Sequence, residues 1–217
     1  MVTLPNGVLI NNLIKDLRIY SWEAADILLH YSEKIKDLGF KKDFLRSTDQ
    51  SDPVTLADLK VNERIIQNIQ ENYLEVDWKI LSEENVKRSS EIQNFNTDWL
   101  WILDPLDGTK DFIQGTRNYA MHLALNYQQK AYIGFVLIPE RNELWISDGE
   151  ETWCETRDKS FKKTLPSINK SLEEMVIVTS KNHRNETLKK LIEKINFDQV
   201  KIKGSIGCKI ASVLRGE

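Results

Sequence analysis

The stretch Trp101-Ile102-Leu103-Asp104-Pro105-Leu106-Asp107-Gly108-Thr109 is the most informative part of the sequence. The run Asp98–Leu103 is continuously apolar after its first residue, which predicts a buried strand. Asp104 comes at the end of that strand, and Pro105 is expected to stop the hydrogen-bonded ladder because proline has no N–H to donate. Taken alone, the stretch is equally compatible with a simple turn, since Asp, Pro and Gly all favour turns.

The residues after the proline predict a site for a cation and an anion. Asp107 is expected in a turn, with Gly108 available for a backbone angle that other residues avoid. Two carboxylates, with a backbone carbonyl freed between them, form the hard ligand set that Mg²⁺ prefers. Thr109 is predicted to cap a short helix that starts near Lys110, and the neighbouring N–H groups would bind an anion beside the metal.

Two further acidic clusters support the cation site over the simple turn. Ser82-Glu83-Glu84 also follows a predicted strand, Trp78–Leu81. Asp58 lies in the first turn of a helix that Thr55 opens. Acidic residues at helix starts are common because of the helix dipole, so Asp58 alone decides little.

The order of the predicted elements indicates layered helices and sheets, an α+β fold. Apolar residues at three- and four-residue steps predict one long helix or two successive helices over 8–38 and a further helix over 55–73, with a loop or exposed hairpin over Lys41–Ser51 between them. The other expected strands are Tyr119–Tyr127, Ala131–Ile138, Glu143–Ser147, Met175–Ser180 and Val200–Lys203, and the other expected helices are His183–Ile195 and Ser205–Leu214. We divide the chain into an α+β part, 1–155, with the acidic motifs, and a smaller α/β part, 156–217.

Three motifs resemble those of the inositol-monophosphatase superfamily. The run WILDPLDGTKDF, 101–112, is similar to its D-P-x-D-G-T signature. Pro53-Val54-Thr55-Leu56-Ala57-Asp58 resembles its P-V-T-x-A-D segment, and Ser82-Glu83-Glu84 its metal-binding Glu pair. The motifs occur in the family's order, over essentially the whole chain. The resemblance implies a layered α/β/α/β/α sandwich and a Mg²⁺-dependent phosphomonoester hydrolase with two or three ions in the complete family site.

The resemblance also implies roles for the metal ligands. Glu83, Asp104 and the carbonyl of Leu106 would hold the first Mg²⁺, and Asp104 would bridge to a second ion held by Asp107. Two ions roughly 3.5–4 Å apart can activate a water and stabilise the attacking and leaving oxygens.

The resemblance also implies roles in water orientation and in phosphate binding. Thr109 with Asp58 would orient the attacking water. The N–H groups of Gly108 and Thr109 would hold the phosphoryl oxygens, with Lys110 also on the substrate side. His30 and His122 are expected to be structural.

Two shorter sequence segments are similar to those of the bisphosphate nucleotidases of the CysQ type, which hydrolyse 3'-phosphoadenosine 5'-phosphate. Ser180-Lys181-Asn182-His183 resembles their S-R-S-H segment, which places His183 on the substrate side. Gly204-Ser205-Ile206-Gly207-Cys208-Lys209 resembles their G-S-x-G-x-K segment, so that Ser205 and Lys209 would recognise a second phosphate. Asp52 stands where the family usually has Ser.

Charge and hydropathy restrict the class of partner. The net charge is −3, with 30 basic and 33 acidic side chains, so a nucleic-acid polymer is an unsuitable partner. A small phosphorylated substrate remains compatible, because bound metal ions can supply positive charge. No apolar stretch reaches the roughly 18 residues of a membrane span. Cys154 and Cys208 are far apart and are expected to be reduced, partly buried thiols, as in a cytoplasmic protein.

The C-terminal end departs from the family pattern. The family continues past the Lys209 helix into a strand and a W-D-x-A segment whose Asp helps to hold the second metal, but none of the six tryptophans here is followed by Asp. The sequence is therefore expected to be a fragment of a normal enzyme, which we favour, or a shortened relative that binds ligand and catalyses poorly. The alternatives to bisphosphate-nucleotide hydrolysis are inositol-1-monophosphate hydrolysis and nucleotide or metal binding without turnover. A homodimer is common among relatives.

Overall fold

The computed structural model describes residues 2–38, 54–88, 95–158, 161–162, 171–180, 186–195 and 197–217. The expected loop over Lys41–Ser51, the first residue of the Pro53–Asp58 motif and His183 lie outside the described residues. No helix within these ranges is both long and apolar enough to cross a membrane.

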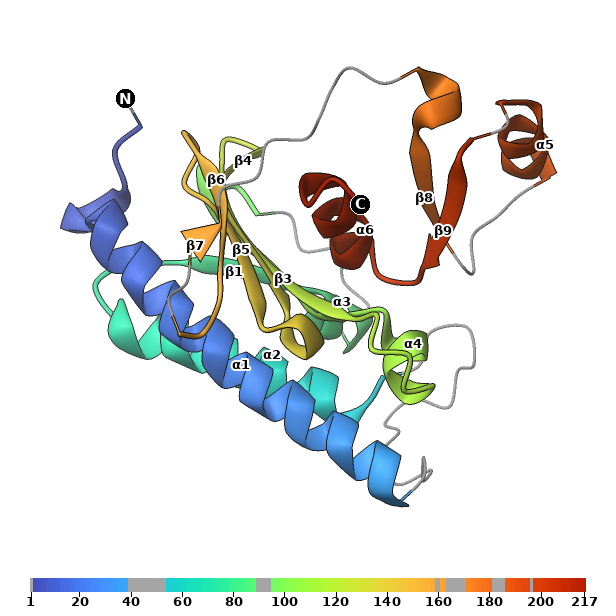
Figure 1. The fold of residues 1–217 in the computed structure, drawn as a ribbon. Coiled ribbons are helices and arrows are strands. Elements are labelled where there is room, and N and C mark those ends of the chain that lie inside the picture. Colours follow the sequence, from blue (N-terminus) through green and yellow to red (C-terminus); the bar gives the residue numbers. More distant parts are fainter. Residues whose placement is uncertain are drawn as a thin grey trace.

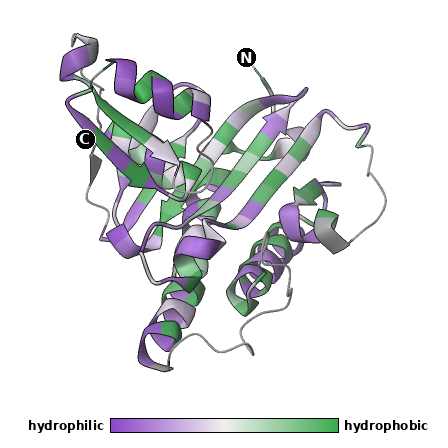
Figure 2. Cartoon of the chain, turned by 90° about the vertical axis from the view of Figure 1, so that its right-hand side faces the viewer, coloured by the Kyte–Doolittle hydropathy of each residue, from purple (hydrophilic) through white to green (hydrophobic). Residues whose placement is uncertain are grey.

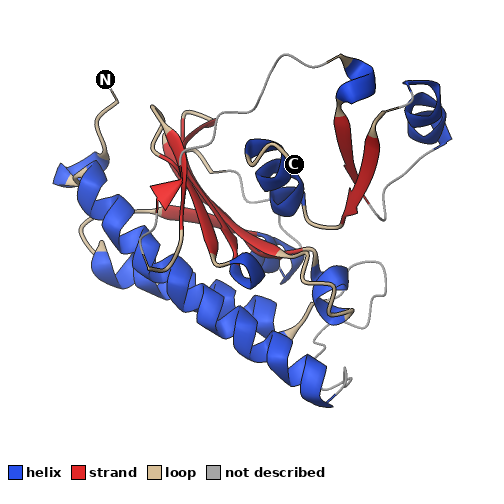
Figure 3. Cartoon of the chain, in the orientation of Figure 1, coloured by secondary structure: helices blue, strands red, loops and turns tan. Residues whose placement is uncertain are grey.

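The described chain contains both helices and strands (Figure 3). The helices are α1 (Ile10–Leu38), α2 (Leu56–Asn72), α3 (Glu83–Arg88), α4 (Thr109–Ile113), α5 (Glu186–Ile195) and α6 (Ile206–Leu214), with 3₁₀ turns at Pro5–Gly7, Pro139–Arg141 (η3) and Leu172–Glu174. The strands are β1 (Lys79–Ser82), β2 (Trp99–Asp107), β3 (Ala120–Tyr127), β4 (Lys130–Ile138), β5 (Glu143–Ser147), β6 (Thr152–Glu155), β7 (Phe161–Lys162), β8 (Val176–Ser180) and β9 (Gln199–Lys203).

Seven strands form one sheet in chain order, β1 to β7. The first pair is parallel and the rest of the sheet is antiparallel. Fully buried and less buried residues largely alternate along β3 and β4, because successive side chains of a strand point to opposite faces. Hydrophobic residues occur along much of these strands (Figure 2). The meander predicted over 119–147 is therefore confirmed, and η3 is the turn between β4 and β5.

The elements form layers (Figure 1). Helices α1 and α2 lie side by side and cover one face of the seven-stranded sheet. On the other face α6 contacts β3 and β4, and its opposite side contacts the parallel pair β8–β9. Figure 1 shows α5 beyond that pair. The α+β layering expected from the sequence is confirmed.

The core lies on both faces of the large sheet. Between the sheet and the helix pair, Leu13, Leu17, Ile65, Trp101 and Phe135 are all essentially inaccessible to solvent. A smaller cluster on the other face joins the sheet to α6: Ala120, Ile138, Trp145, Cys154, Cys208 and Ala211. Cys154 and Cys208 are both buried.

Strand β2 differs from its prediction at Pro105. The strand was expected to end at Asp104, but it continues to Asp107. Asp104 pairs with His122 and Asp107 with Ala120, so β2 contains one more residue than β3 over this stretch. Proline is tolerated here because a bulge removes the need for its missing N–H. The predicted interruption of the ladder is thus a bulge inside the strand.

Three local features were also not predicted correctly. The acidic pair Glu83-Glu84 follows a strand as expected, but it also begins a short helix, α3, which was not predicted. Thr109 is the first residue of α4, and its N-cap is Gly108, without a side-chain hydrogen bond, so Thr109 does not cap this helix. The edge strands β6 and β7 are too short for a clear alternating pattern.

Candidate functional site

Three carboxylates gather at one end of the β1–β2 pair. Because β1 and β2 run parallel, with Ser82 opposite Leu103, Glu83 follows β1 at the same edge where Asp104 lies in β2. A hydrogen bond joins the Glu83 and Asp104 carboxyls. Burial raises the pKa of Asp104 well above its usual range, and repulsion from Glu83 and Asp107 raises it further. A cation at this place would remove that repulsion.

Asp107 has the opposite electrostatic environment. Its Oδ2 accepts hydrogen bonds from the Ser205 hydroxyl at 2.6 Å and the Gly207 amide at 3.1 Å, and lies 3.0 Å from Nε2 of His122. Burial alone would raise the pKa of Asp107, but the hydrogen bonds from His122 and Ser205 outweigh burial and hold the pKa below its usual value. Asp107 is therefore a carboxylate held in place by three donors.

Asp58 and Thr109 lie close to each other, next to the strand segment that carries Asp104 and Asp107. Asp58 closes a capping box with Thr55 at the start of α2, and its Oδ1 lies 3.5 Å from the Thr109 hydroxyl. That hydroxyl also lies 3.0 Å from the carbonyl of Leu106, and it can donate its single proton to only one acceptor at a time. Burial raises the pKa of Asp58 to about 7, and the nearby Glu84 adds to the increase.

Gly108 makes the tight connection between β2 and α4. Its φ is +90°, and a Cβ atom at this position would lie 2.8 Å from the Asn118 carbonyl oxygen. Both the backbone angle and the close approach require glycine, as the sequence predicted. Thr109 and Lys110 are partly exposed at the start of α4.

The start of α6 brings one of the expected phosphate-binding residues, Ser205, into contact with the site. Ser205 is fully buried; its hydroxyl caps α6 through the Cys208 amide and donates to Asp107. The amine of Lys209 lies 3.2 Å from the Gly204 carbonyl oxygen, one turn back along the chain. Recognition of a second phosphate by Ser205 and Lys209 stays a prediction.

The donor set fits a hard divalent cation. Glu83 is exposed while Asp104 and Asp107 are partly buried, so the carboxylates open towards solvent. Among the described residues, no group of three His, Cys, Asp or Glu side chains is arranged to hold a metal ion by itself. Mg²⁺ usually keeps several waters and uses one or two protein carboxylates together with substrate oxygens. The site chemistry is therefore compatible with Mg²⁺ and does not resemble a closed metal cage.

Two contributors could not be identified from the sequence. His122 lies opposite Asp104 in the β2–β3 register, yet in the sequence it stands between apolar residues as an ordinary strand residue. Asn62 accepts a hydrogen bond from the buried Ser82 hydroxyl, which anchors the end of β1 to α2. Both contacts depend on strand register and helix packing, for which no short motif exists.

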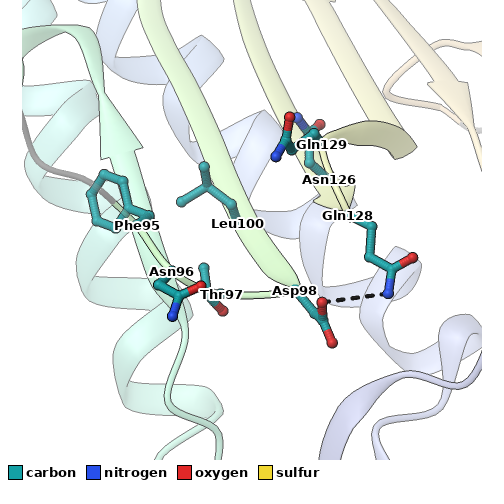
Figure 4. A pocket seen from close by; sticks show the side chains of 8 residues that line it. All are labelled: Phe95, Asn96, Thr97, Asp98, Leu100, Asn126, Gln128 and Gln129. Carbon is teal, nitrogen blue, oxygen red and sulfur yellow. Dashed lines mark hydrogen bonds between the residues drawn. The ribbon is translucent and has the colours of Figure 1, made fainter.

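A cavity of about 650 Å³ lies at the other end of β2 (Figure 4). Its lining includes Asp98, Leu100, Asn126 and Gln129, and Gln128 donates to Asp98 at 3.5 Å. None of the candidate catalytic or metal-binding residues lines this cavity.

Comparisons with known proteins agree with the fold. A family model described as the inositol monophosphatase family matches residues 18–217. The 3'(2'),5'-bisphosphate nucleotidase CysQ of Buchnera aphidicola subsp. Acyrthosiphon pisum is 29% identical over 178 residues, 82% of this chain and 62% of that relative. The bifunctional phosphatase IMPL2, chloroplastic, of Arabidopsis thaliana is 31% identical over 165 residues, 75% of this chain and 45% of that relative. The chain thus spans less than two thirds of the length of either relative.

Solved structures give the same result. The crystal structure of CysQ from Bacteroides thetaiotaomicron has a TM-score of 0.65 and 26% identity, covering 89% of this chain and 72% of that one. The extragenic suppressor protein suhB from Bartonella henselae has a TM-score of 0.72 and 22% identity, covering 93% of this chain and 74% of that one. Since the family model covers nearly the whole chain and the folds agree, the chain belongs to the inositol monophosphatase family.

Proposed function

We propose that this chain carries the site of a Mg²⁺-dependent phosphomonoester hydrolase whose substrate is a 3'(2'),5'-bisphosphate nucleotide such as 3'-phosphoadenosine 5'-phosphate, with AMP and phosphate as products. The observation that supports the proposal best is the position of Asp104. Its carboxyl interacts with those of both Glu83 and Asp107, and Thr109, which contacts Asp58, also contacts the Leu106 carbonyl between the two aspartates in the chain. A hydrolase needs these two functions, charge neutralisation and water orientation, in one place.

Glu83, Asp104, Asp107 and the Leu106 carbonyl would hold Mg²⁺. Bound Mg²⁺ neutralises the phosphoryl oxygens and lowers the pKa of water. Phosphoryl transfer otherwise requires little covalent chemistry from the protein, because positioning and electrostatic stabilisation supply most of the catalysis.

Thr109 and Asp58 would orient the attacking water. If the Leu106 carbonyl held Mg²⁺, the Thr109 hydroxyl would donate its hydrogen bond to Asp58 Oδ1, and its oxygen would accept a hydrogen bond from the water. Because burial raises the pKa of Asp58 to about 7, this carboxyl can accept a proton near neutral pH. The amides of Gly108 and Thr109 would contact the phosphoryl oxygens, with Lys110 and His183 on the substrate side.

The nucleotide is preferred to inositol phosphate because relatives named CysQ recur among the matches, at 27–29% identity over more than four fifths of this chain. The second candidate substrate is inositol-1-monophosphate, because the structure is similar to those of inositol monophosphatases. At 24% identity or less, this similarity is one of fold. A relative that binds nucleotide or metal without turnover is the third. From the resemblance to the family, we also propose a cytoplasmic location, a role in sulfate assimilation, inhibition by lithium, and a homodimer of the kind that is common among relatives.

Phosphate release tests the proposal. The purified chain is incubated with 3'-phosphoadenosine 5'-phosphate or inositol 1-phosphate, with Mg²⁺ or with EDTA. Asp104→Asn removes the central carboxylate, and Asp98→Asn is a matched control, since Asp98 is an exposed aspartate just before the opposite end of β2.

We expect Mg²⁺-dependent release from the nucleotide that persists in Asp98→Asn and falls by at least 10²-fold in Asp104→Asn. Faster release from inositol 1-phosphate would contradict the proposed nucleotide substrate but would agree with the proposed mechanism. Nucleotide binding by calorimetry without release from either substrate would contradict hydrolysis and support the binding protein.

A further inference from the structure

One oxygen of Asp107 is fully used by hydrogen bonds. Its Oδ2 receives the Ser205 hydroxyl and the Gly207 amide from the start of α6, and Nε2 of His122 from β3. An ionised carboxylate can only accept, so His122 donates from Nε2. A carboxylate oxygen has about two lone-pair sites, so three donors leave Oδ2 without capacity for a cation.

The same contacts hold the start of α6 against β3. A Cβ atom at Gly207 would lie 2.9 Å from both Cε1 and Nε2 of His122, and 2.9 Å from Cβ of Ala120. The first turn of α6 therefore approaches the imidazole so closely that only glycine fits. Ser205 is buried, with its hydroxyl shared between Asp107 and the Cys208 amide. The imidazole, the glycine and the serine form one packed unit around Asp107.

From this arrangement we infer that His122 is a positioning residue: it fixes Asp107 with Oδ2 turned to α6 and Oδ1 presented as the single oxygen for a divalent cation. The inference rests on the proposed function, because it assumes that Asp107 is a ligand, and it assigns a role that the sequence motifs do not contain. It also gives Ser205 a function in holding Asp107, separate from the recognition of a second phosphate. Hydrogen-bonded partners of metal-binding carboxylates typically change metal affinity by 10- to 100-fold when they are removed.

Two substitutions separate positioning from mere packing. His122→Gln keeps an N–H donor and part of the volume, whereas His122→Leu keeps volume and removes the donor. His30→Leu is the matched control, because His30 is exposed on α1 and outside the site. Three quantities are measured for each variant. Calorimetry gives the Mg²⁺ affinity, and amide hydrogen exchange in EDTA gives the protection of Gly207 and Cys208 without metal. Phosphate release as a function of Mg²⁺ concentration gives the Mg²⁺ requirement of the activity.

We expect His122→Leu to weaken Mg²⁺ binding by at least 10-fold and to speed exchange at Gly207 by a similar factor. His122→Gln should remain within about 3-fold of the wild type on both measurements, as a hydrogen-bond role requires. Activity of His122→Leu should recover at excess Mg²⁺, so that the Mg²⁺ requirement changes more than kcat.

Equal Mg²⁺ affinity in the wild type and His122→Leu, or equal losses in the Gln and Leu variants, would overturn the positioning role. So would a wild-type chain that binds no Mg²⁺. If the wild type binds Mg²⁺ with the expected variant pattern but releases no phosphate, the inference stands and the proposed function fails. The exchange measurement in EDTA is independent of activity.

Discussion

Asp104 and Asp107 are three residues apart in one strand, yet their surroundings have opposite electrostatic effects. Asp107 has three hydrogen-bond donors on one oxygen, and its pKa is lowered despite burial. Asp104 has the Leu106 amide at 3.1 Å as a donor, while Glu83 and Asp107 repel its charge. The unfavourable electrostatic energy of the site is therefore concentrated on Asp104, where a cation would relieve it.

Neutralising each aspartate should change stability in opposite directions. We expect Asp104→Asn to stabilise the metal-free protein by about 1 kcal/mol, which is roughly 2–4 °C in Tm for a chain of this size. A carboxyl whose pKa is raised on folding contributes stability that is lost as pH rises through the folded pKa, so the gain should be larger at pH 9 than at pH 6. Thermal unfolding in EDTA measures it.

Asp107→Asn is the matched comparison. It removes the charge from three hydrogen bonds and should destabilise the protein by about 1.5–3 kcal/mol. Stabilisation by both substitutions, or by neither, would show that the two carboxyls have similar environments.

At the scale of elements, Glu140 joins α1 to the sheet. Its carboxylate accepts from the Ser32 hydroxyl at 2.9 Å and the Lys36 amine at 3.2 Å, both in α1, and from the Tyr119 hydroxyl at 3.1 Å. Tyr119 in turn packs edge-on against Phe112 of α4. The carboxylate thus ties α1 to the segment that carries Gly108, although it lies outside every motif.

The Glu140 contacts should appear in the pH dependence of stability. Burial opposes the charged form, but the donors from Ser32 and Lys36 outweigh it and lower the pKa of Glu140. A lowered carboxyl pKa contributes stability that is present above the unfolded pKa, about 4.3, and is lost as pH falls through the folded pKa. We expect Glu140→Gln to cost about 1–3 kcal/mol at pH 7 and much less at pH 3.

Urea denaturation at the two pH values measures this difference. Glu63→Gln is the control, because Glu63 forms an exposed ion pair with Lys60 and should change stability by less than about 0.5 kcal/mol. Equal losses for Glu140→Gln at pH 7 and pH 3 would mean that packing, not charge, is responsible.

Local patterns predicted the elements well where periodicity is long, as in α1 and α2, and where strands alternate, as in β3 to β5. They failed where tertiary contacts decide. The sequence cannot show that a bulge lets β2 pass Pro105, because the bulge depends on pairing with β3. For the candidate site, motifs pointed to Asp104, Asp107, Gly108 and Ser205. They could not predict that Ser205, Gly207 and His122 all contact Asp107, because these partners are 15 to 100 positions away in the chain.

At the scale of the molecule, α6 connects the C-terminal part to the large sheet. The Gly204 backbone touches the buried Asp111 of α4 so closely that a Cβ atom would lie 1.8 Å from Oδ2. Gly204→Ala must therefore move Asp111 or the whole turn, and we expect a loss of about 1–3 kcal/mol in urea denaturation. Gly134→Ala in β4, where a Cβ meets nothing within 4 Å, should change little by comparison. Similar small effects at both glycines would contradict the close packing of the two parts.

The other end of α6 is held by a largely buried ion pair. Nη1 of Arg215 lies 2.5 Å from Oε2 of Glu143 in β5, with 8% and 16% of the side chains exposed. Breaking such a pair leaves an uncompensated charge, so Arg215→Ala should cost about 3–5 kcal/mol. Arg64→Ala, which removes an exposed pair with Glu23 at 3.9 Å, should cost less than about 1 kcal/mol.

A double substitution distinguishes the pair from its surroundings. In the variant Glu143→Leu with Arg215→Met, both charges of the pair are replaced by apolar groups, while Glu217, which also pairs with Arg215, keeps Lys203 and Arg141 as partners. Stability should return to within about 1 kcal/mol of the wild type, because a buried ion pair offsets little more than its own desolvation. The free energy of unfolding is measured in urea for both single variants and the double variant. If the double variant loses as much as the sum of the single losses, the two residues act independently, and α6 is held to the sheet by the apolar contacts around Trp145 and Cys208 instead.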